Sequence, residues 1–440
     1  MTGFSRRDFS KLAGAAGAGA LTSAAWGTFA IAQGAAKVVI VGGGAGGATA
    51  AHFIKKEAPN LDVTLIEANA IYSSSFFSNL YLGGFRTLES LNHGYAGLRR
   101  LGIKVVHDFA TDVDSTRKRV KTRGGRTYAY DRLVLSPGID IKYDSIKGYS
   151  RDVARNMPHA YNTDATQKRL LKQQLQNMKD GGTVAMVMPN NPFRCPPGPY
   201  ERACMIAHFL KTRKPKSKLV ILDPKRAFSK QPVFVEAFDK YYKNIIELNL
   251  STEIDDFSVV SVDPKTKEIV TKAGKTVRAD VANIIPQQRA GEIAAKAGIN
   301  EGDWCPVNPE NFSARKVRDI YVLGDAAIAV EMPKSAFSAN SQAKVVASDI
   351  ASALAKKDKF EARYRNTCWS LLAPDDNVKV GANYAAKDGK LEPSGSFISQ
   401  RGEAADVRKQ NYQESIAWYH NITAEMFAKT APAAAAKKAG

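Results

Sequence analysis

Cysteine and histidine are scarce in this sequence, with four cysteines and six histidines among 440 residues. No Cys-x-x-Cys-His motif occurs, so the chain attaches no c-type haem of its own. Cys204 and His208 stand one helical turn apart, but two ligands without visible partners make a metal site the minor interpretation of this pair. We therefore predict that the protein holds no metal.

Long hydrophobic runs are also missing. The apolar run near the N-terminus is short and rich in glycine, which argues against a membrane anchor. A composition of 44% hydrophobic and 24% charged residues is typical of a soluble globular protein, and the length suffices for two or three domains. The formal charge of +20 is dispersed and comes without a nucleic-acid-binding motif. An acidic protein partner or an anionic substrate fits this charge better than nucleic acid.

The first 32 residues have the features of an export signal. Arg6 and Arg7 precede an Ala/Gly-rich run that ends in Ala30-Ile31-Ala32, before Gln33. This order is typical of a twin-arginine signal peptide with a small-residue cleavage site. We expect export to the periplasm as a folded protein, with any cofactor loaded beforehand. All four cysteines would then enter an oxidising compartment, where disulfides persist.

The strongest pattern in the chain is a dinucleotide-binding motif. Its parts follow in the expected order: a buried strand at 37–41, Gly42, Gly44 and Gly47 as G-x-G-x-x-G, a helix at 48–56, a second strand at 63–66, and Glu67. The glycines permit a tight turn and let a pyrophosphate approach the helix N-terminus, while Glu67 is placed to bind ribose hydroxyls. A plain glycine turn would not need the strand, helix and acid in this order.

Two later segments indicate which dinucleotide is bound. "YDRLVLSPG" at 130–138 is a strand that runs into a Pro-Gly turn, and "IYVLGDAA" at 320–327 is a strand that ends in Gly324-Asp325. This pair resembles the two short motifs of glutathione-reductase-like flavoproteins. The resemblance implies FAD as the cofactor, with Asp325 bonding its ribityl chain.

Such proteins have a second dinucleotide fold for NAD(P)H, and its first strand should be "GGTVAMVM" at 181–188. The chain continues with "PNNPFRCPPGPYERA" where a glycine-rich turn would follow. Prolines and bulky residues stand where glycines must let a phosphate approach, so we expect nicotinamide binding to be lost.

Cys195 occupies this altered loop, at the C-terminal end of a predicted strand, where α/β sheets handle ligands. The flanking prolines restrict the backbone and hold the sulfur rigidly, and Arg194 would favour the thiolate. A redox disulfide needs a partner, and Cys368 in "RNTCWSLLAP" is available. A structural disulfide is the competing interpretation.

Several segments carry a resemblance that spans almost the whole mature chain: "FRCPPGPYERA", "IIPQQRAG" (284–291), "FSKQ" (228–231), "MPKSAFSANSQAK" (332–344), "NTCWSLLAP" and "HGYAGLRRLGIKVVHD" (93–108). Together they resemble the flavoprotein subunit of flavocytochrome c sulfide dehydrogenases, and equally the related flavoprotein of sulfur-oxidation gene clusters. The resemblance implies that Cys195 and Cys368 form a redox disulfide beside the flavin and that Glu201 lies at the same site.

One departure from the family concerns flavin attachment. Its best-known members attach FAD through a cysteine in the segment equivalent to "IYSSSFFSNLYLGG" (71–84), and the aligned position here is Ser75. Serine cannot form the thioether, so we expect non-covalent FAD. Cys305 also stands where the family has cysteine, and we interpret it as a buried structural thiol.

The expected fold is α/β: a glutathione-reductase-like flavoprotein with two Rossmann-type domains and a C-terminal interface domain. The FAD domain is expected to be split between 33–147 and 279–350, around a second Rossmann-like domain at 148–278 that lacks an NAD loop. Residues 351–440 would form the interface domain and a disordered tail. A helix that begins near Ser338-Ala339-Asn340 is expected to point its N-terminus at the flavin.

The expected function is a periplasmic, FAD-dependent sulfide dehydrogenase that makes sulfur or polysulfide and reduces a separate c-type cytochrome in a heterodimer. Glu201 would move protons, unless it forms a surface salt bridge with Arg202 or Arg194. Two alternatives stay open: an NAD(P)H-dependent disulfide or quinone reductase of the same fold, and a non-catalytic flavoprotein that binds a cytochrome. The missing second glycine loop and the lack of Cys-x₄-Cys near the first helix argue against the reductase.

Overall fold

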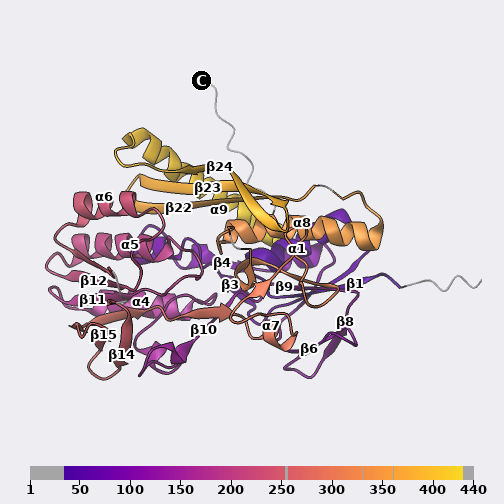
Figure 1. Ribbon diagram of the computed structural model, residues 1–440, viewed down its shortest axis with the longest axis horizontal. Coiled ribbons are helices and arrows are strands. Elements are labelled where there is room, and N and C mark those ends of the chain that lie inside the picture. Colours follow the sequence, from indigo (N-terminus) through magenta and orange to yellow (C-terminus); the bar gives the residue numbers. More distant parts are fainter. Residues whose placement is uncertain (1–33, 253–255, 330, 360, 430–440) are drawn as a thin grey trace, which may run out of the picture. The chain divides into compact units, whose positions relative to one another are not determined.

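The computed structural model describes residues 34–252, 256–329, 331–359 and 361–429. The expected signal peptide (1–32) and the end of the chain after Lys429 lie outside the described residues. From Ala36 onward the chain belongs to one unit. This unit contains two parallel sheets and a C-terminal antiparallel sheet (Figure 1).

The first parallel sheet has five strands, in the order β20, β9, β1, β2, β5. These strands are β20 (Ile320–Val322), β9 (Arg132–Leu135), β1 (Lys37–Val41), β2 (Asp62–Ile66) and β5 (Lys104–Val106). Neighbouring strands pair in parallel throughout. Four of the five residues of β1 and of β2 are buried, as expected for parallel strands covered on both faces.

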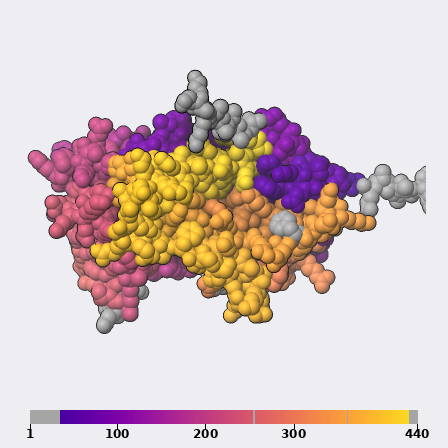
Figure 2. Space-filling view, turned by 90° about the horizontal axis from the view of Figure 1, so that it is seen from above, coloured from indigo at the N-terminus to yellow at the C-terminus, as the bar shows by residue number. Residues whose placement is uncertain are grey.

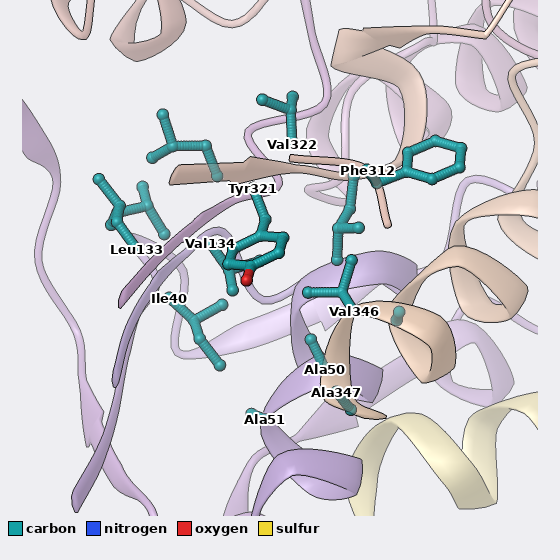
Figure 3. Packing of buried hydrophobic residues seen from close by; sticks show 14 of the residues in the cluster. Ile40, Ala50, Ala51, Leu133, Val134, Phe312, Tyr321, Val322, Val346 and Ala347 are labelled. Carbon is teal, nitrogen blue, oxygen red and sulfur yellow. The ribbon is translucent and has the colours of Figure 1, made fainter. Parts of the chain in front are cut away.

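Helix α1 (Ala45–Glu57) follows β1 and packs against α8 (Ala336–Ala355). The buried face of α1 consists largely of glycine and alanine, so the two helices come close together. Figure 3 shows Ala50 of α1 beside Val346 and Ala347 of α8, with the sheet residue Ile40 close by. This packing positions the N-termini of both helices at the carboxyl edge of the sheet.

The second parallel sheet contains β13 (Ile246–Leu250), β12 (Lys218–Asp223), β11 (Thr183–Val187) and β17 (Val281–Ile284), in that order. Its helices are α4 (Thr166–Asn177), α5 (Gly198–Arg213) and α6 (Gln231–Tyr242). Because β17 pairs with β11, the inserted domain extends through residue 284. The predicted boundary at 278/279 is therefore a few residues too early. The chain returns through β18 (Gln288–Ala290), which pairs with β10 (Ile139–Ile141).

The C-terminal part is an antiparallel sheet of β22 (Arg363–Ala373), β23 (Asp376–Lys387) and β24 (Lys390–Ile398), followed by α9 (Ala405–Phe427). Strand β22 packs on α5 of the inserted domain and on α8 of the first domain. In Figure 2 the yellow C-terminal residues lie between the magenta inserted domain and the indigo first domain. The C-terminal sheet thus reaches both Rossmann-type domains.

The remaining elements are short: β3 (Ile71–Ser73), α2 (Ser78–Gly83), β4 (Asn92–Gly94), α3 (Ala96–Arg100), β6 (Ala110–Asp114), β7 (Arg119–Thr122), β8 (Thr127–Ala129), β14 (Val259–Asp263), β15 (Glu268–Thr271), β16 (Thr276–Arg278), α7 (Ile293–Lys296), β19 (Cys305–Pro306) and β21 (Ala327–Ile328). Of the helices in the described residues, none combines the length and apolar character needed to cross a membrane.

Candidate flavin and thiol site

A cavity with an empty volume of about 1200 Å³ lies along the carboxyl edge of the first sheet. The turns after β1, β2, β9 and β20 contribute Gly42, Gly44, Glu67, Ser136, Gly138, Gly324 and Asp325 to its lining. Parallel α/β sheets bind ligands at this edge, where the loops after the strands converge. The dinucleotide motif and the two later motifs therefore meet at one cavity, as the sequence predicted.

The glycine turn after β1 is shaped by close backbone contacts. Gly42 has a φ of +96°, and a Cβ atom there would lie 2.2 Å from the carbonyl oxygen of Ser136. A Cβ on Gly47 would lie 1.9 Å from the carbonyl oxygen of Gly42. Gly47 therefore supports the turn from behind, whereas Gly44 lines the cavity.

Glu67 is fixed at the end of β2 by two backbone donors. The N–H groups of Gly43 and Asn69 donate to its carboxylate at 2.6 and 2.8 Å. The carboxylate lies beside the glycine turn and lines the cavity. This is the place that a ribose-binding acid requires.

The lining fits a polar ligand that accepts and donates hydrogen bonds. The hydroxyl of Tyr161 and the side-chain oxygen of Asn162 are buried and have no partner, and both residues line the cavity. Helix α1 has no side-chain cap at Gly44, so its first N–H groups are free for a phosphate. A dinucleotide would satisfy these groups. The sequence offered no signal for Tyr161 or Asn162, because they lie in a connection without a motif.

Ser75, the position of the family's attaching cysteine, also lines the cavity. Its hydroxyl donates to the carbonyl oxygen of Asn162 at 3.0 Å. Residue 75 therefore lies at the flavin cavity, but it is a serine whose hydroxyl is hydrogen-bonded to the backbone.

Asp325 lines the cavity, and Arg194 binds it directly. The Nε of Arg194 donates to the Asp325 carboxylate at 2.6 Å, and its Nη1 donates to the Tyr161 carbonyl at 2.7 Å. The charge of Arg194 is thus balanced by Asp325 and not by the neighbouring thiol. The expectation that Arg194 favours the Cys195 thiolate is wrong, because Lys230 is the cation that lowers the pKa of this thiol most.

Asn340 lies inside α8 and outside the cavity lining. Its amide donates to Thr49 Oγ1 at 3.1 Å and to Glu425 at 2.8 Å, so it ties α8 to α1 and α9. Helix α8 begins at Ala336 and is capped by Ser335, and these two residues line the cavity. The helix N-terminus does face the cavity, but the side chain of Asn340, which we expected to bind the cofactor, points elsewhere.

Cys195 sits in the first cavity with an unusual backbone. Its φ is +56°, a left-handed conformation that non-glycine residues rarely adopt. Its N–H donates to the carbonyl of Lys334 at 2.8 Å, and its own carbonyl accepts from the N–H of Gly198 at 2.7 Å. A Cβ on Gly198 would lie 2.9 Å from Cys195 Sγ, so glycine makes room for the sulfur at the start of α5.

Cys368 comes from β22 and lines a second cavity, with an empty volume of about 1330 Å³. Pro196 and Pro197 line the same cavity, so the loop after Cys195 borders both cavities. Within the described residues all four cysteines are free thiols. Burial raises the pKa of the Cys195 thiol, and the charge of Cys368 raises it further, so the two groups lie near enough to interact electrostatically. The expected disulfide is therefore a proposal that rests on this proximity.

Glu201 projects from α5 into the same cluster. Its carboxylate accepts from the N–H of Leu371 at 2.9 Å and from the amide of Asn79 at 2.7 Å. Burial raises the pKa of Glu201, while these hydrogen bonds and the charge of Lys230 oppose the rise. A carboxyl with a raised pKa suits proton transfer close to the thiols.

The surface salt bridge considered for Glu201 does not form among the described residues. Arg202 is buried, and its guanidinium donates to the side chains of Asn79 and Asn283 and to two backbone carbonyls. Arg194 binds Asp325. Both arginines are therefore occupied elsewhere.

Lys230 lies within the segment "FSKQ" and was not among the predicted site residues. It stands before α6, and its Nζ donates to the carbonyl of Cys368 at 3.1 Å and to Ser370 Oγ at 2.8 Å. Pattern reasoning had no reason to single it out, because Lys230 and Cys368 are 138 residues apart.

The other two cysteines behave as expected of structural thiols. Cys305 is fully buried in the core of the first domain. Cys204 is buried in α5, and His208 packs against Phe85 with ring centroids 4.9 Å apart. No group of three or more His, Cys, Asp or Glu residues in the described ranges could hold a metal ion.

Three family models match the chain. Residues 168–286 match the central part of the sulfide dehydrogenase (flavocytochrome c) flavoprotein chain, and residues 360–427 match the flavin-binding model of flavocytochrome c sulphide dehydrogenase. Residues 36–188 match the pyridine nucleotide-disulphide oxidoreductase model. The sulfide dehydrogenase (flavocytochrome c) flavoprotein chain of Chlorobaculum thiosulfatiphilum is 44% identical over 46 residues, which are 10% of this chain and 96% of that relative.

The chain belongs to the flavocytochrome c sulfide dehydrogenase flavoprotein family. It is a flavoprotein oxidoreductase of a sulfide-oxidising family, and its cofactor is FAD. The residues that would hold FAD are those of the first cavity described above.

More distant relatives share the fold. The mitochondrial sulfide:quinone oxidoreductase of Mus musculus is 21% identical to this chain. The match covers 66% of this chain and 65% of that relative. The sulfide-quinone reductase of Aquifex aeolicus is 23% identical to this chain, and the match covers 87% of this chain and 90% of that relative. The solved structure of the Aquifex aeolicus sulfide:quinone oxidoreductase has a TM-score of 0.70 at 18% identity, covering 90% of this chain and 93% of that one. The ferredoxin reductase structure from Rhodopseudomonas palustris has a TM-score of 0.62 at 18% identity, and the match covers 79% of this chain and 82% of that one. The predicted two-domain Rossmann-type flavoprotein fold is confirmed.

Proposed function

We propose that this protein is an exported sulfide dehydrogenase that passes electrons from hydrosulfide, through a Cys195–Cys368 disulfide and FAD, to a c-type cytochrome. The observation that carries the proposal is the meeting of the two thiols. Cys195, from the inserted domain, lines the flavin cavity, and Cys368, from the C-terminal sheet, lies near enough for its charge to raise the pKa of the Cys195 thiol. Residues this far apart in sequence gain little structurally from two neighbouring, reactive thiols, whereas a redox pair requires them.

The two cavities suggest how the substrate reaches the disulfide. Cys368 lines the second cavity, so hydrosulfide reaches its sulfur without crossing the flavin cavity. Attack there breaks the Cys195–Cys368 bond, forms Cys368–S–SH, and leaves Cys195 as a thiolate that faces the flavin cavity. Overall, HS⁻ gives sulfane sulfur, one proton and two electrons. FAD supplies the capacity to take two electrons together and release them one at a time.

Glu201 is placed to take the proton. Its carboxylate is held by Asn79 and the Leu371 N–H, and its charge is felt at both thiols. Because burial raises its pKa, the carboxyl holds a proton more readily than an exposed one. In this role Glu201 exchanges the proton of the substrate sulfur.

A cytochrome acceptor is supported by the family and by an aromatic cluster. The matched family models are named after a flavocytochrome c. Phe76 lines the flavin cavity and contacts Trp418 with ring centroids 5.6 Å apart. Trp418 also stacks on Phe337 and contacts Trp369, with centroids 5.8 and 5.4 Å apart. These half-buried rings lead from the flavin cavity toward the C-terminal surface, where an electron-accepting partner can dock.

The two alternative functions, an NAD(P)H-dependent reductase and a non-catalytic flavoprotein, predict different electron donors and acceptors. Strand β11 is followed by residues 188–197, which contain prolines and Cys195 where an NAD(P)H fold has glycines. We therefore expect the purified, FAD-loaded protein to reduce a c-type cytochrome with sulfide as donor and to be inert with NADH. Measuring cytochrome reduction with each donor, and with a soluble quinone in place of the cytochrome, separates the three functions. Flavin reduction by NADH as fast as by sulfide would contradict the proposal.

A periplasmic location rests on the twin-arginine pattern at Arg6 and Arg7. Expressing the full chain and a variant with both arginines replaced by lysine, followed by fractionation, tests it. We expect FAD-loaded protein in the periplasmic fraction only for the natural chain. Equal distribution of both forms would refute the location.

A further inference from the structure

Lys230 is a buried lysine in contact with the thiol-bearing strand. The residue is only 2% exposed to solvent, and its backbone is left-handed, with a φ of +60°. The Nζ atom donates to the carbonyl of Cys368 at 3.1 Å, to Ser370 Oγ at 2.8 Å and to the Val378 carbonyl at 3.5 Å. The ammonium is thus held between β22 and β23 by three neutral acceptors.

A buried ammonium without an anionic partner is unfavourable, because burial removes its hydration and no opposite charge compensates for the lost solvation energy. Among the described residues, Lys230 forms no ion pair. Lys225, another buried lysine, shows the usual solution, with its Nζ 2.7 Å from the Asp223 carboxylate. Some other feature must therefore account for the charge at Lys230.

The titratable groups whose charges act on Lys230 are Cys368, Glu201 and Cys195. Each can become an anion, and burial raises the pKa of all three. Other charged or titratable groups also interact electrostatically with the thiols: Asp325, Arg202 and Tyr161 with Cys195, and Tyr384 with Cys368. Asp325 is paired with Arg194, and Arg202 is held by neutral acceptors. Lys230, held on the strand that carries Cys368, is thus a cation whose charge lowers the pKa of both thiols.

We propose that Lys230 is a positioning residue for the thiol pair, whose ammonium stabilises the sulfur anion formed when the disulfide opens. The inference rests on the proposed function. In the step HS⁻ + R–S–S–R′ → R–S–SH + R′–S⁻, the S–S bond breaks, a new S–S bond forms, and one negative charge stays on a buried protein sulfur. The neutral acceptors keep the ammonium in place before this charge appears.

A purely structural role is the competing account, in which Lys230 only ties α6 to the C-terminal sheet. Two neutral replacements separate the accounts. Lys230→Met keeps the length and loses both charge and hydrogen bonds, whereas Lys230→Gln loses the charge but keeps a neutral hydrogen-bond donor on a slightly shorter side chain. Lys230→Arg keeps the charge. Lys172→Met is the matched control, because Lys172 is also buried and donates to a single carbonyl, that of Leu82, at 2.6 Å.

The measurement is the rate at which iodoacetamide alkylates Cys195, the sulfur that the proposed step leaves as a thiolate, and Cys368, in the reduced, FAD-loaded protein as a function of pH, read by peptide mass. We expect Lys230→Met and Lys230→Gln to shift the profile up by about one pH unit, which slows alkylation about tenfold at a fixed pH. Lys230→Arg and Lys172→Met should keep the natural profile. If Lys230→Met does not fold, Lys230→Gln carries the same expectation.

The inference is overturned if Lys230→Gln keeps the natural profile, because the hydrogen bonds alone would then suffice. The assay contains no sulfide, so it is independent of the proposed function. Failure of sulfide to reduce FAD in the natural protein would refute the function and, with it, the role of Lys230 in the reaction. Reduction of FAD by sulfide together with an unshifted Lys230→Gln profile would refute the inference alone.

Discussion

Among single residues, Ser75 determines how the flavin is retained. It lines the flavin cavity at the position where the resemblance implies an attaching cysteine in the family's best-known members, and its hydroxyl donates to the carbonyl oxygen of Asn162. Without a thiol at this position no thioether forms, so acid or heat denaturation should release all FAD into the supernatant. The flavin absorbance of supernatant and pellet after precipitation measures this. Yellow colour that stays with the polypeptide would contradict the prediction.

The residues that sequence placed correctly at the cavity belong to motifs with fixed spacing. Gly42, Gly44 and Glu67 follow from one strand–helix–strand unit, because local geometry determines where their atoms lie. Arg194 was misjudged, because its partner Asp325 is 131 residues away and no local pattern indicates their pairing. Lys230 was missed for the same reason.

At the level of elements, the turn between β1 and α1 depends on Gly47. A Cβ on Gly47 would lie 1.9 Å from the Gly42 carbonyl oxygen, so Gly47→Ala must open the turn that meets the pyrophosphate. We expect this variant to lose most of its FAD and about 1–3 kcal/mol of folding stability. The ratio of flavin to protein absorbance and the thermal midpoint measure both effects.

Gly34→Ala is the matched control for this prediction, because a Cβ there would meet no atom within 4 Å. It should keep both FAD and thermal midpoint. Full FAD occupancy in Gly47→Ala would show that the turn tolerates a side chain and that the close approach is not required.

Element types were easier to predict than their boundaries. The parallel strands are nearly continuous apolar runs, and these identify β1, β2 and β11 directly. The strand β17 has the same character, but only its pairing with β11 assigns it to the inserted domain. The pairing of β11 with β17, about 95 residues later in the chain, is a tertiary contact that sequence spacing does not encode. Helix α8 likewise begins at Ala336, slightly ahead of the predicted start near Ser338-Ala339-Asn340, because Ser335 caps it.

For the whole molecule, two buried histidines link stability to pH. Burial lowers the pKa of His93 and of His159 from 6.5 to about 4. Between these values the unfolded chain binds protons that the folded protein does not. Stability is therefore fully present above about pH 6.5 and is lost as the pH falls toward 4, by up to about 3 kcal/mol per histidine.

The thermal midpoint at neutral pH and at about pH 5 tests this linkage. We expect the natural protein to lose stability at the lower pH and His159→Gln to lose less. His420→Gln, the same substitution at an exposed position, is the control. An equal loss in His159→Gln and the natural protein would contradict the assignment.

The proposed mechanism needs all three parts of the molecule. The first domain supplies the flavin cavity, the inserted domain supplies Cys195 and Glu201, and the C-terminal sheet supplies Cys368. The C-terminal sheet contacts both Rossmann-type domains through β22, the strand that carries Cys368. The central claim is that these two thiols form the path from sulfide to flavin.

The most direct test is anaerobic addition of sulfide to the FAD-loaded protein, followed by the flavin absorbance in a stopped-flow instrument. The natural protein and Cys305→Ser should bleach rapidly, because Cys305 is buried in the first domain and takes no part. Cys195→Ser and Cys368→Ser should keep their FAD and thermal midpoint but bleach at least about a hundredfold more slowly. Rapid bleaching of Cys195→Ser, or no bleaching of the natural protein, would contradict the account.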